Sequence, residues 1–149
     1  MRALITGSEG FIGRHLVTEL IQNGYEVVRS DLRSTEGVVS LDILDLEQTK
    51  QVLEDYTPDL LINMAGQADV RLSWKKPQKT VELNTIGMII LLEAVKITNP
   101  QMRVIAVGSS DEYGSLKEKG INVTEDIPVN PITPYAISKV CTGTVCNDL

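Results

Sequence analysis

The sequence predicts an α/β fold in which helices cover both faces of a doubly wound parallel sheet. Short apolar runs alternate with longer segments of helical periodicity along the 149 residues. One run, residues 59–65, is apolar enough to be buried on both faces, as strands of parallel sheets are. The chain also opens with a strand, a glycine-rich turn and a helix. Right-handed crossovers between such strands predict the sheet order 3-2-1-4-5.

Three glycines follow the first predicted strand. Gly7 allows a sharp turn, Gly10 lets backbone amides approach a phosphate, and Gly13 lets the following helix pack closely against the strand. The first helical residues, Phe11 and Ile12, offer free N–H groups at the positive end of the helix dipole. The sequence therefore predicts that this turn binds a pyrophosphate. An ordinary tight turn is the alternative for a glycine triplet taken alone.

The second predicted strand ends at an acidic residue, Asp31. A carboxylate at this point can accept hydrogen bonds from both ribose hydroxyls of an adenosine, which favours NAD over NADP. Arg29 and Arg33 flank Asp31 and could hold a 2′-phosphate instead, so NADP stays open. A solvated loop aspartate is the simpler alternative.

The remaining elements continue the alternation of strands and helices. The long helix that begins at Pro77 has Asn99-Pro100 as its stop, and Pro134 begins the last helix. After residue 31 we expect strands at 38–42, 59–65 and 102–107, helices at 46–56, 77–98 and 134–149, and an irregular stretch at 108–133. The length predicts one domain over residues 1–149.

The last predicted helix carries Tyr135 and Lys139, whose spacing of four places them on one helix face. A lysine ammonium stabilises a neighbouring phenolate, which makes Tyr135 usable as a general acid or base for a carbonyl or hydroxyl group. This spacing alone is common on helices. Residues 107–114 strengthen the interpretation, because they place two hydroxyls and the acidic pair Asp111 and Glu112 at a strand end where open α/β sheets bind ligands.

Composition excludes several classes of partner. A net charge of −6 and a pI near 4.8 argue against nucleic acid, which needs a basic face. No apolar run is long enough for a membrane helix, and no secretory signal opens the chain, so a cytoplasmic location is expected. Cys141 and Cys146 are expected to be reduced thiols, and with the single His15 they show no metal-ligand spacing.

A series of motifs occurs along the chain: Thr6-Gly7-x-x-Gly10-x-x-Gly13, Asp31, Asp42-Ile43, Met64-Ala65-Gly66, Asn84-x-x-Gly87, Ser109-Ser110-Asp111 and Tyr135-x-x-x-Lys139. In this order they resemble the extended short-chain dehydrogenase/reductases, the NAD-dependent epimerase/dehydratase family, over nearly the whole chain. The resemblance implies a Rossmann-type fold. The most similar branch acts on nucleotide-sugars. Residues 66–74 and 108–114 are similar to GDP-mannose 4,6-dehydratases and equally to GDP-4-keto-6-deoxymannose reductases.

The resemblance implies cofactor contacts for most of these positions. Asp31 would hold the adenosine ribose. The pyrophosphate would lie against Gly7, Gly10 and Gly13, the adenine against Asp42 and Ile43, and the nicotinamide ribose against Met64, Ala65 and Gly66. The implied cofactor is therefore NAD, with NADP as the alternative.

The resemblance also implies catalytic roles. Tyr135 would be the acid/base at the C4 oxygen of the sugar, Ser109 would hydrogen-bond the same oxygen, and Lys139 would bind the nicotinamide ribose and tune Tyr135. The dehydratases carry a glutamate where this chain has Asp111, and it works on the C5 proton during water loss. Reductases of this branch also carry an acid there, so dehydratase, reductase and epimerase chemistry all stay open.

The family continues well past the Tyr-x-x-x-Lys helix into a part that holds the nucleotide-sugar, whereas this sequence stops at Leu149. We therefore expect a chain truncated before the substrate part, which binds NAD and turns over poorly or not at all. A non-catalytic NAD-binding module is the alternative. The family further implies a homodimer in which helices 77–98 and 134–149 form a four-helix bundle, with Val81, Ile89 and Ile90 as candidate contacts.

Overall fold

The computed structural model describes residues 1–33, 35–115 and 122–148, and in it five parallel strands form one sheet in the order β3-β2-β1-β4-β5. This order confirms the prediction. The strands are β1 (Arg2–Thr6), β2 (Glu26–Asp31), β3 (Val39–Ser40), β4 (Leu60–Asn63) and β5 (Arg103–Ala106). Strands β3, β4 and β5 are shorter than predicted, because ladder pairing stops before the apolar runs do.

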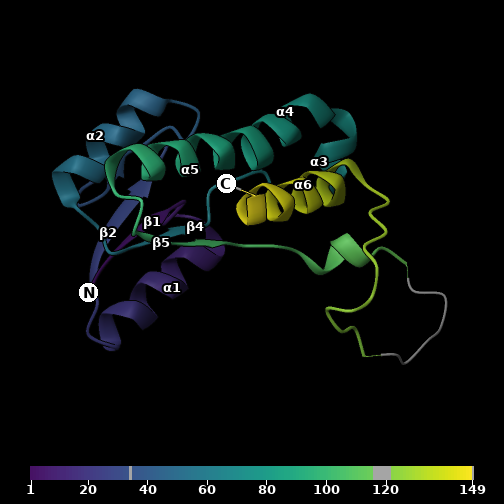
Figure 1. Ribbon diagram of the computed structural model, residues 1–149, viewed down its shortest axis with the longest axis horizontal. Helices are drawn as coiled ribbons and strands as arrows, with labels where there is room; N and C mark the ends of the chain where they lie inside the picture. The colour runs from purple at the N-terminus through teal and green to yellow at the C-terminus, as the bar shows by residue number, and fades with distance from the viewer. Residues whose placement is uncertain (34, 116–121, 149) are drawn as a thin grey trace.

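Two layers of helices enclose the sheet (Figure 1). Helix α1 (Phe11–Gln22) covers one face, where Val17 packs with Ile5 of β1 and Ile62 of β4. Helices α2 (Leu46–Tyr56) and α5 (Gly87–Thr98) cover the other face. Their core joins Leu53 and Leu91 to alternate strand residues such as Leu4. Strand residues therefore alternate between the two cores, as side chains of a strand with both faces buried must.

The helix predicted over residues 77–98 is interrupted. It consists of α4 (Pro77–Val81), a π-helical turn η1 (Glu82–Ile86) and α5, and the N–H of Gly87 donates to the C=O of Glu82. The sequence also missed a short helix, α3 (Val70–Lys75), whose first turn is capped by the Asp69 carboxylate. Residues 70–75 are therefore helical, and α3 packs against α4.

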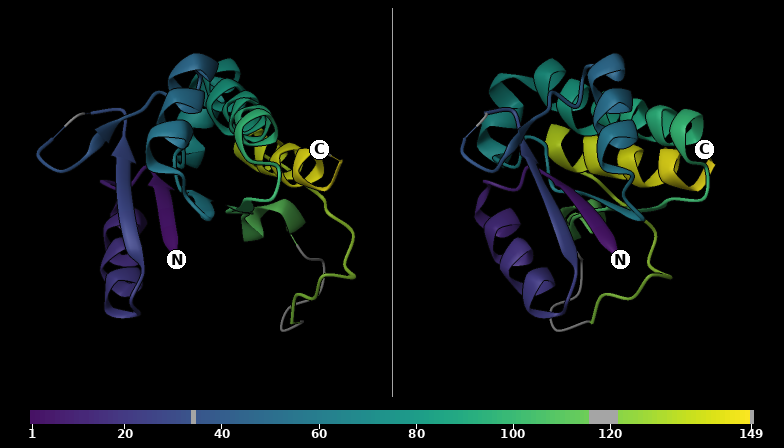
Figure 2. Two further views of the ribbon diagram at one scale, coloured as in Figure 1. Left: turned by 60° about the vertical axis from the view of Figure 1, so that its left-hand side comes forward. Right: turned by 90° about the vertical axis from the view of Figure 1, so that its left-hand side faces the viewer.

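Helix α6 (Pro134–Asp148) lies against α3, α4 and η1 and reaches the end of β5. Leu149, the predicted end of this helix, lies outside the described residues. Between β5 and α6 a 3₁₀ turn, η2 (Ser110–Tyr113), interrupts the predicted irregular stretch. Figures 1 and 2 show the described part of this stretch looping away from the sheet before the chain returns into α6.

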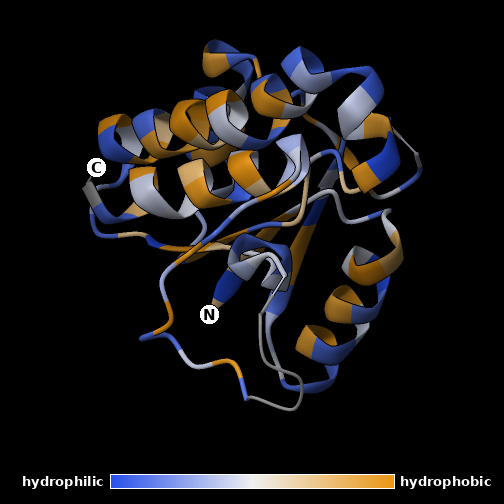
Figure 3. Cartoon of the chain, turned by 90° about the vertical axis from the view of Figure 1, so that its right-hand side faces the viewer, coloured by the Kyte–Doolittle hydropathy of each residue, from blue (hydrophilic) through white to orange (hydrophobic). Residues whose placement is uncertain are grey.

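Strand β5 is the outer strand on its side of the sheet. Its Ile105 side chain is 47% exposed, on a strand whose neighbour β4 is buried throughout. In Figure 3 the helices on both sides of the sheet carry apolar (orange) and polar (blue) segments, as helices that cover a sheet with one face do. Among the described helices, none is long and apolar enough to cross a membrane.

Candidate active site

The glycine turn after β1 has the geometry that the sequence predicts. Gly7 has φ +66°, and a Cβ there would lie 2.7 Å from the backbone nitrogen of Ala65. A Cβ on Gly13 would lie only 2.3 Å from the carbonyl oxygen of Gly7, so glycine is required for α1 to sit this close to the turn. Gly10 is the N-cap of α1, and neither a side-chain cap nor an acidic residue occupies the first turn. The N–H groups of that turn are therefore available to an anion.

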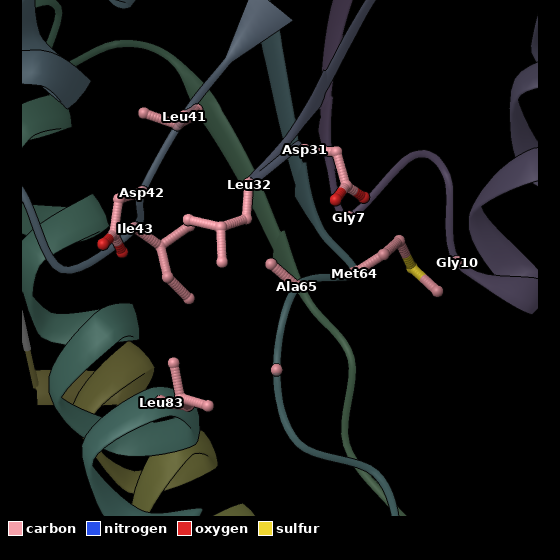
Figure 4. Close-up of a pocket in the computed structure, with 11 residues that line it drawn as sticks. Gly7, Gly10, Asp31, Leu32, Leu41, Asp42, Ile43, Met64, Ala65 and Leu83 are labelled. Atoms are coloured by element: carbon pink, nitrogen blue, oxygen red, sulfur yellow. The ribbon is translucent and has the colours of Figure 1, made fainter. Parts of the chain in front are cut away.

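A pocket of about 260 Å³ opens at the carboxyl ends of the strands, beside this turn (Figure 4). The side chains of Ile43 and Leu83 point toward one another across it, and the Asp31 carboxylate lies next to Gly7. The lining residues are Gly7, Gly10, Asp31, Leu32, Leu41, Asp42, Ile43, Met64, Ala65, Gly66 and Leu83. The pocket is thus mainly apolar, with a carboxylate and a glycine turn at one end, which fits an adenine and its ribose followed by a pyrophosphate.

Asp31 links β2 to the glycine turn. Its Oδ2 accepts a hydrogen bond from the N–H of Glu9 at 3.2 Å, and its carboxylate lines the pocket. Arg29, in contrast, is held away from a ligand: its guanidinium pairs with Glu9 at 3.7 Å and donates to the carbonyls of Glu36 and Gly37. Arg33 is exposed. Of the two arginines, Arg29 is therefore already held by contacts within the chain.

On α6, Lys139 turns toward the end of β5. Its Nζ donates to the carbonyl oxygen of Val107 at 2.7 Å. Burial lowers the pKa of Lys139, and the negative charge of Glu112 partly opposes this effect. Tyr135 lies one turn earlier and is half-buried. The predicted lysine therefore occupies a desolvated position at the sheet edge, within reach of the residues that follow β5.

The turn η2 presents the predicted hydroxyl and carboxylates. Ser109 is its N-cap and accepts from the N–H of Asp111 at 3.2 Å, while Glu112 accepts from the N–H of Ser109 at 2.8 Å. This reciprocal capping box orders the turn. The Ser109 hydroxyl keeps its proton for donation to a ligand, and Asp111 is half-buried beside it.

The structure gathers the predicted cofactor residues unequally. Eight of them line the pocket, whereas Phe11, Ile12 and Gly13 lie just beyond it in the first turn of α1. Ser109, Asp111, Tyr135 and Lys139 do not line this pocket and gather instead around η2 and α6, which pack together. The predicted residues thus form two groups, one that lines the pocket and one around η2 and α6 at the end of β5.

Three apolar residues that line the pocket were not predicted from the sequence. Leu32 follows Asp31 directly, and Leu41 precedes the predicted Asp42, so neighbourhood along the chain was the available signal. Leu83 comes from the π-turn, where it is half-buried. Apolar side chains that wall a ligand look like core residues in a sequence, which explains why they were missed.

Comparison with known proteins identifies the class of the chain. Residues 3–149 match the NAD dependent epimerase/dehydratase family, and the chain belongs to that family. Among curated relatives, UDP-glucose 4-epimerase of Mycolicibacterium smegmatis is 32% identical over 94% of this chain and 48% of its own length. GDP-mannose 4,6-dehydratase of Vibrio cholerae is 30% identical over 93% of this chain and 42% of its own length. The chain therefore spans about half the length of these relatives.

Solved structures give the same result. UDP-glucose 4-epimerase from Brucella ovis in complex with NAD superposes with a TM-score of 0.90 and 30% identity over 99% of this chain and 47% of that one. The protein RMD from Pseudomonas aeruginosa, complexed with NADPH, gives a TM-score of 0.85 and 26% identity over 99% of this chain and 48% of that one. The neighbours thus include an NAD complex and an NADPH complex, and the relatives act on more than one nucleotide-sugar.

Proposed function

We propose that this chain binds NAD across the carboxyl edge of its sheet and forms the cofactor part of a nucleotide-sugar epimerase/dehydratase. The observation that carries the proposal is the pocket itself. It joins an uncapped helix N-terminus, the Gly7 turn and the Asp31 carboxylate to an apolar slot between Ile43 and Leu83. These are the groups that a diphosphate, a ribose diol and an adenine ring need, in that order.

The residues of α6 and η2 suit proton transfer at a sugar hydroxyl. Bound nicotinamide would supply the hydride acceptor and donor for the sugar C4 position. Tyr135 would take the proton from the C4 oxygen and return it, and Ser109 would donate a hydrogen bond to the same oxygen. Lys139 would hold a ribose hydroxyl and favour the Tyr135 phenolate through its charge. Asp111 would act on the C5 proton if the reaction includes loss of water.

NAD is the proposed cofactor in preference to NADP, because the Asp31 carboxylate lines the pocket beside the glycine turn and Arg29 is already held by Glu9 and two carbonyls. Calorimetric titration with both dinucleotides tests this. The wild-type chain should bind NAD more tightly than NADP. Asp31→Ala should raise the dissociation constant of NAD by roughly tenfold or more and bring it closer to that of NADP. The exposed Asp55→Ala is the matched control. Failure of the wild-type chain to bind either dinucleotide would refute the proposal.

For the substrate we propose a GDP-mannose-type nucleotide-sugar, with 4,6-dehydration or 4-keto-6-deoxy-sugar reduction as the reaction. The support is the likeness of residues 66–74 and 108–114 to those enzymes. UDP-glucose 4-epimerases are also among the relatives, so epimerisation is the competing assignment. Product analysis separates these reactions. A dehydratase should convert GDP-mannose with NAD into a 4-keto-6-deoxy sugar, and a reductase should consume that 4-keto sugar together with the reduced dinucleotide. An epimerase should convert UDP-glucose into UDP-galactose.

The 149-residue chain by itself should bind cofactor and give little or no product. The described residues supply a cofactor pocket and the Ser109, Tyr135 and Lys139 groups, but the relatives are about twice as long. A non-catalytic NAD-binding module remains the second candidate for the same reason. Normal turnover by the isolated chain would exclude the module. NAD binding without product from any nucleotide-sugar would favour it.

We also propose that two copies associate through the outer faces of the α4–α5 helix and α6. Val81, Ile86, Ile97 and Ile137 expose between 36% and 55% of their surface there. Ile89 and Ile90, the other predicted contacts, are only half-exposed. An apolar stripe on neighbouring antiparallel or parallel helices is the kind of face that a four-helix bundle buries.

A further inference from the structure

A buried hydrogen-bonded cluster joins the π-turn η1 to helix α6. Its members are Asn84 and Thr85 of η1 and Ser138 and Thr142 of α6, and none of them exposes more than 7% of its surface. The hydroxyl of Thr85 donates to the Ser138 carbonyl at 3.1 Å. The hydroxyl of Thr142 lies 2.9 Å from the Asn84 carbonyl and 2.8 Å from that of Ser138. Polar groups so fully enclosed hold their partners firmly, because losing one leaves the other unsatisfied.

Asn84 attaches this cluster to the wall of the cofactor pocket. Its Oδ1 accepts from the N–H of Gln67 at 2.7 Å, and its Nδ2 donates to the carbonyl of Gln67 at 3.0 Å. Gly66, the preceding residue, lines the pocket, and a Cβ there would lie 2.7 Å from the Asn84 Oδ1. The side-chain amide of Asn84 therefore fixes the loop after β4 through two hydrogen bonds to the backbone of Gln67.

Ser138 continues the connection to the catalytic helix. Its Oγ accepts from the Asn84 Nδ2 at 2.9 Å and donates to the carbonyl of Tyr135 at 2.6 Å. The residue lies between Tyr135 and Lys139 in sequence. Its hydroxyl faces η1, while the Lys139 side chain reaches the end of β5. One unbroken chain of hydrogen bonds thus runs from the pocket wall to the backbone that carries the proposed acid/base pair.

The π-turn makes this arrangement possible. Because the Gly87 N–H bonds to the Glu82 carbonyl, the helix is locally wound wider than an α-helix. Within this wider turn the Asn84 carbonyl accepts from the Thr142 hydroxyl. Single π-turns inside α-helices occur frequently at functional sites. In this chain the turn presents both the side chain and the carbonyl of Asn84 to the elements it joins.

We propose that Ser138 is a positioning residue, which through Asn84 sets Tyr135 and Lys139 at a fixed height relative to the cofactor pocket. The catalytic purpose of this positioning rests on the proposed function, whereas the effect of Ser138 on the Lys139 side chain does not depend on it. Without the Ser138 hydroxyl, the bonds from Thr85 and Thr142 still join α6 to η1, but the Asn84 amide loses its partner on α6. The first turn of α6 can then shift, so the Lys139 side chain loses its fixed approach to the Val107 carbonyl and gains contact with water.

The test compares Ser138→Ala with Thr144→Ala in the full 149-residue chain. Thr144 is exposed on the same helix, and its hydroxyl donates only to the Val140 carbonyl, so the control removes a hydroxyl from α6 without a link to η1. The first readout is the titration of Lys139, followed by NMR of ¹³Cε-labelled lysine and assigned with Lys139→Gln. The second is the NAD dissociation constant from calorimetry. Urea unfolding of each variant shows whether it is folded under the conditions of the NMR and the calorimetric measurements.

Ser138→Ala should raise the Lys139 titration midpoint toward that of an exposed lysine and weaken NAD by about tenfold, the size expected for one buried hydrogen-bonding group. Thr144→Ala should change neither. An unchanged Lys139 midpoint in folded Ser138→Ala would overturn the proposal and leave the serine a purely structural role. If wild type binds no NAD, the cofactor assignment fails, but the lysine titration still decides on positioning.

A second variant guards against misfolding of the first. Thr85→Val keeps the shape of the side chain and the Ser138 hydroxyl but removes the bond from Thr85 to the Ser138 carbonyl, which Thr142 still satisfies. The Lys139 midpoint should move in the same direction by a smaller amount. If Ser138→Ala does not fold, an unchanged Lys139 midpoint in folded Thr85→Val would contradict the proposal.

Discussion

Gly13 is held between the glycine turn and α1 with no room for a side chain. An added Cβ would lie 2.3 Å from the Gly7 oxygen and 2.9 Å from the Cα of Ser8, and both are backbone atoms. Gly13→Ala should therefore push α1 away from the turn, at a cost of about 1–3 kcal/mol in the free energy of unfolding. Because the N–H groups of α1 move with the helix, NAD affinity should fall by at least about tenfold, as calorimetry would measure.

Gly143 provides the matched control on α6. Nothing lies within 4 Å of a Cβ built there, and the residue is exposed. Gly143→Ala should raise the free energy of unfolding by about 0.5–1 kcal/mol through helix propensity and leave NAD binding unchanged. A Gly13→Ala chain that titrates with NAD like the wild type would show that the dinucleotide does not use this turn.

The burial of Lys139 predicts a dependence of stability on pH. Its pKa is lowered in the folded chain, so between that value and the ordinary value of 10.5 the unfolded chain binds more protons. The free energy of unfolding contributed by this group therefore rises with pH across that window. Lys139→Gln should remove this rise, which urea titrations at a series of alkaline pH values would measure as a flatter curve than that of wild type. Parallel curves would mean that the lysine is solvated.

At the scale of the elements, the Glu112 side chain of η2 caps its own turn and its charge acts on the pKa of Lys139 in α6. Glu112→Gln keeps an oxygen that can accept from the Ser109 N–H, so the turn should persist. It removes the negative charge that opposes the lowering of the Lys139 pKa. We expect the Lys139 pKa to fall further, measured by the same ¹³Cε-lysine titration. Glu125→Gln, an exposed change outside η2, should leave it unmoved. An identical lysine titration in both variants would show that Glu112 does not act on Lys139.

At the scale of the whole molecule, the proposed pairing of two copies depends on the outer face of η1 and α5. Ile86→Glu places a charge on this face, where Ile86 is 43% exposed, and should convert dimers to monomers in sedimentation experiments. Ile21→Glu makes the same change at a 56% exposed position on α1, in the opposite layer, and should leave the association unchanged. A wild-type chain that is monomeric at high concentration would remove the proposal.

The alternation of strands and helices could be predicted because each strand is a short apolar run and each long helix has a recognisable start or stop. The π-turn could not, since the apolar positions from Val81 to Leu91 suit an α-helix equally well. The extra residue in that turn is accommodated through contacts of Asn84 with Gln67 and Ser138, which are distant in sequence. Helix α3 was hidden for a different reason: it has only six residues, too few to show a period.

The candidate site divides in the same way. Gly7, Asp31 and the Tyr135–Lys139 pair could be identified because their chemistry and spacing are unusual for purely structural residues. Leu83 and Ser138 could not, because an apolar wall and a buried hydroxyl have no signature of their own. Their roles emerge only when the loop after β4, η1 and α6 are seen in contact. Such supporting residues depend on tertiary structure, which one sequence does not display.

Strand β5 is one of the two edge strands of the sheet, and among the described residues no strand pairs with its outer side, next to the half-exposed Ile105. The backbone groups of such an edge can pair with an extended segment of another chain, and this association increases with concentration. We therefore expect aggregation of the 149-residue chain at high concentration to begin at this edge strand rather than at the cofactor pocket. Ile105→Lys should lower the turbidity of concentrated samples. It should leave the NAD dissociation constant unchanged, since Ile105 does not line the cofactor pocket.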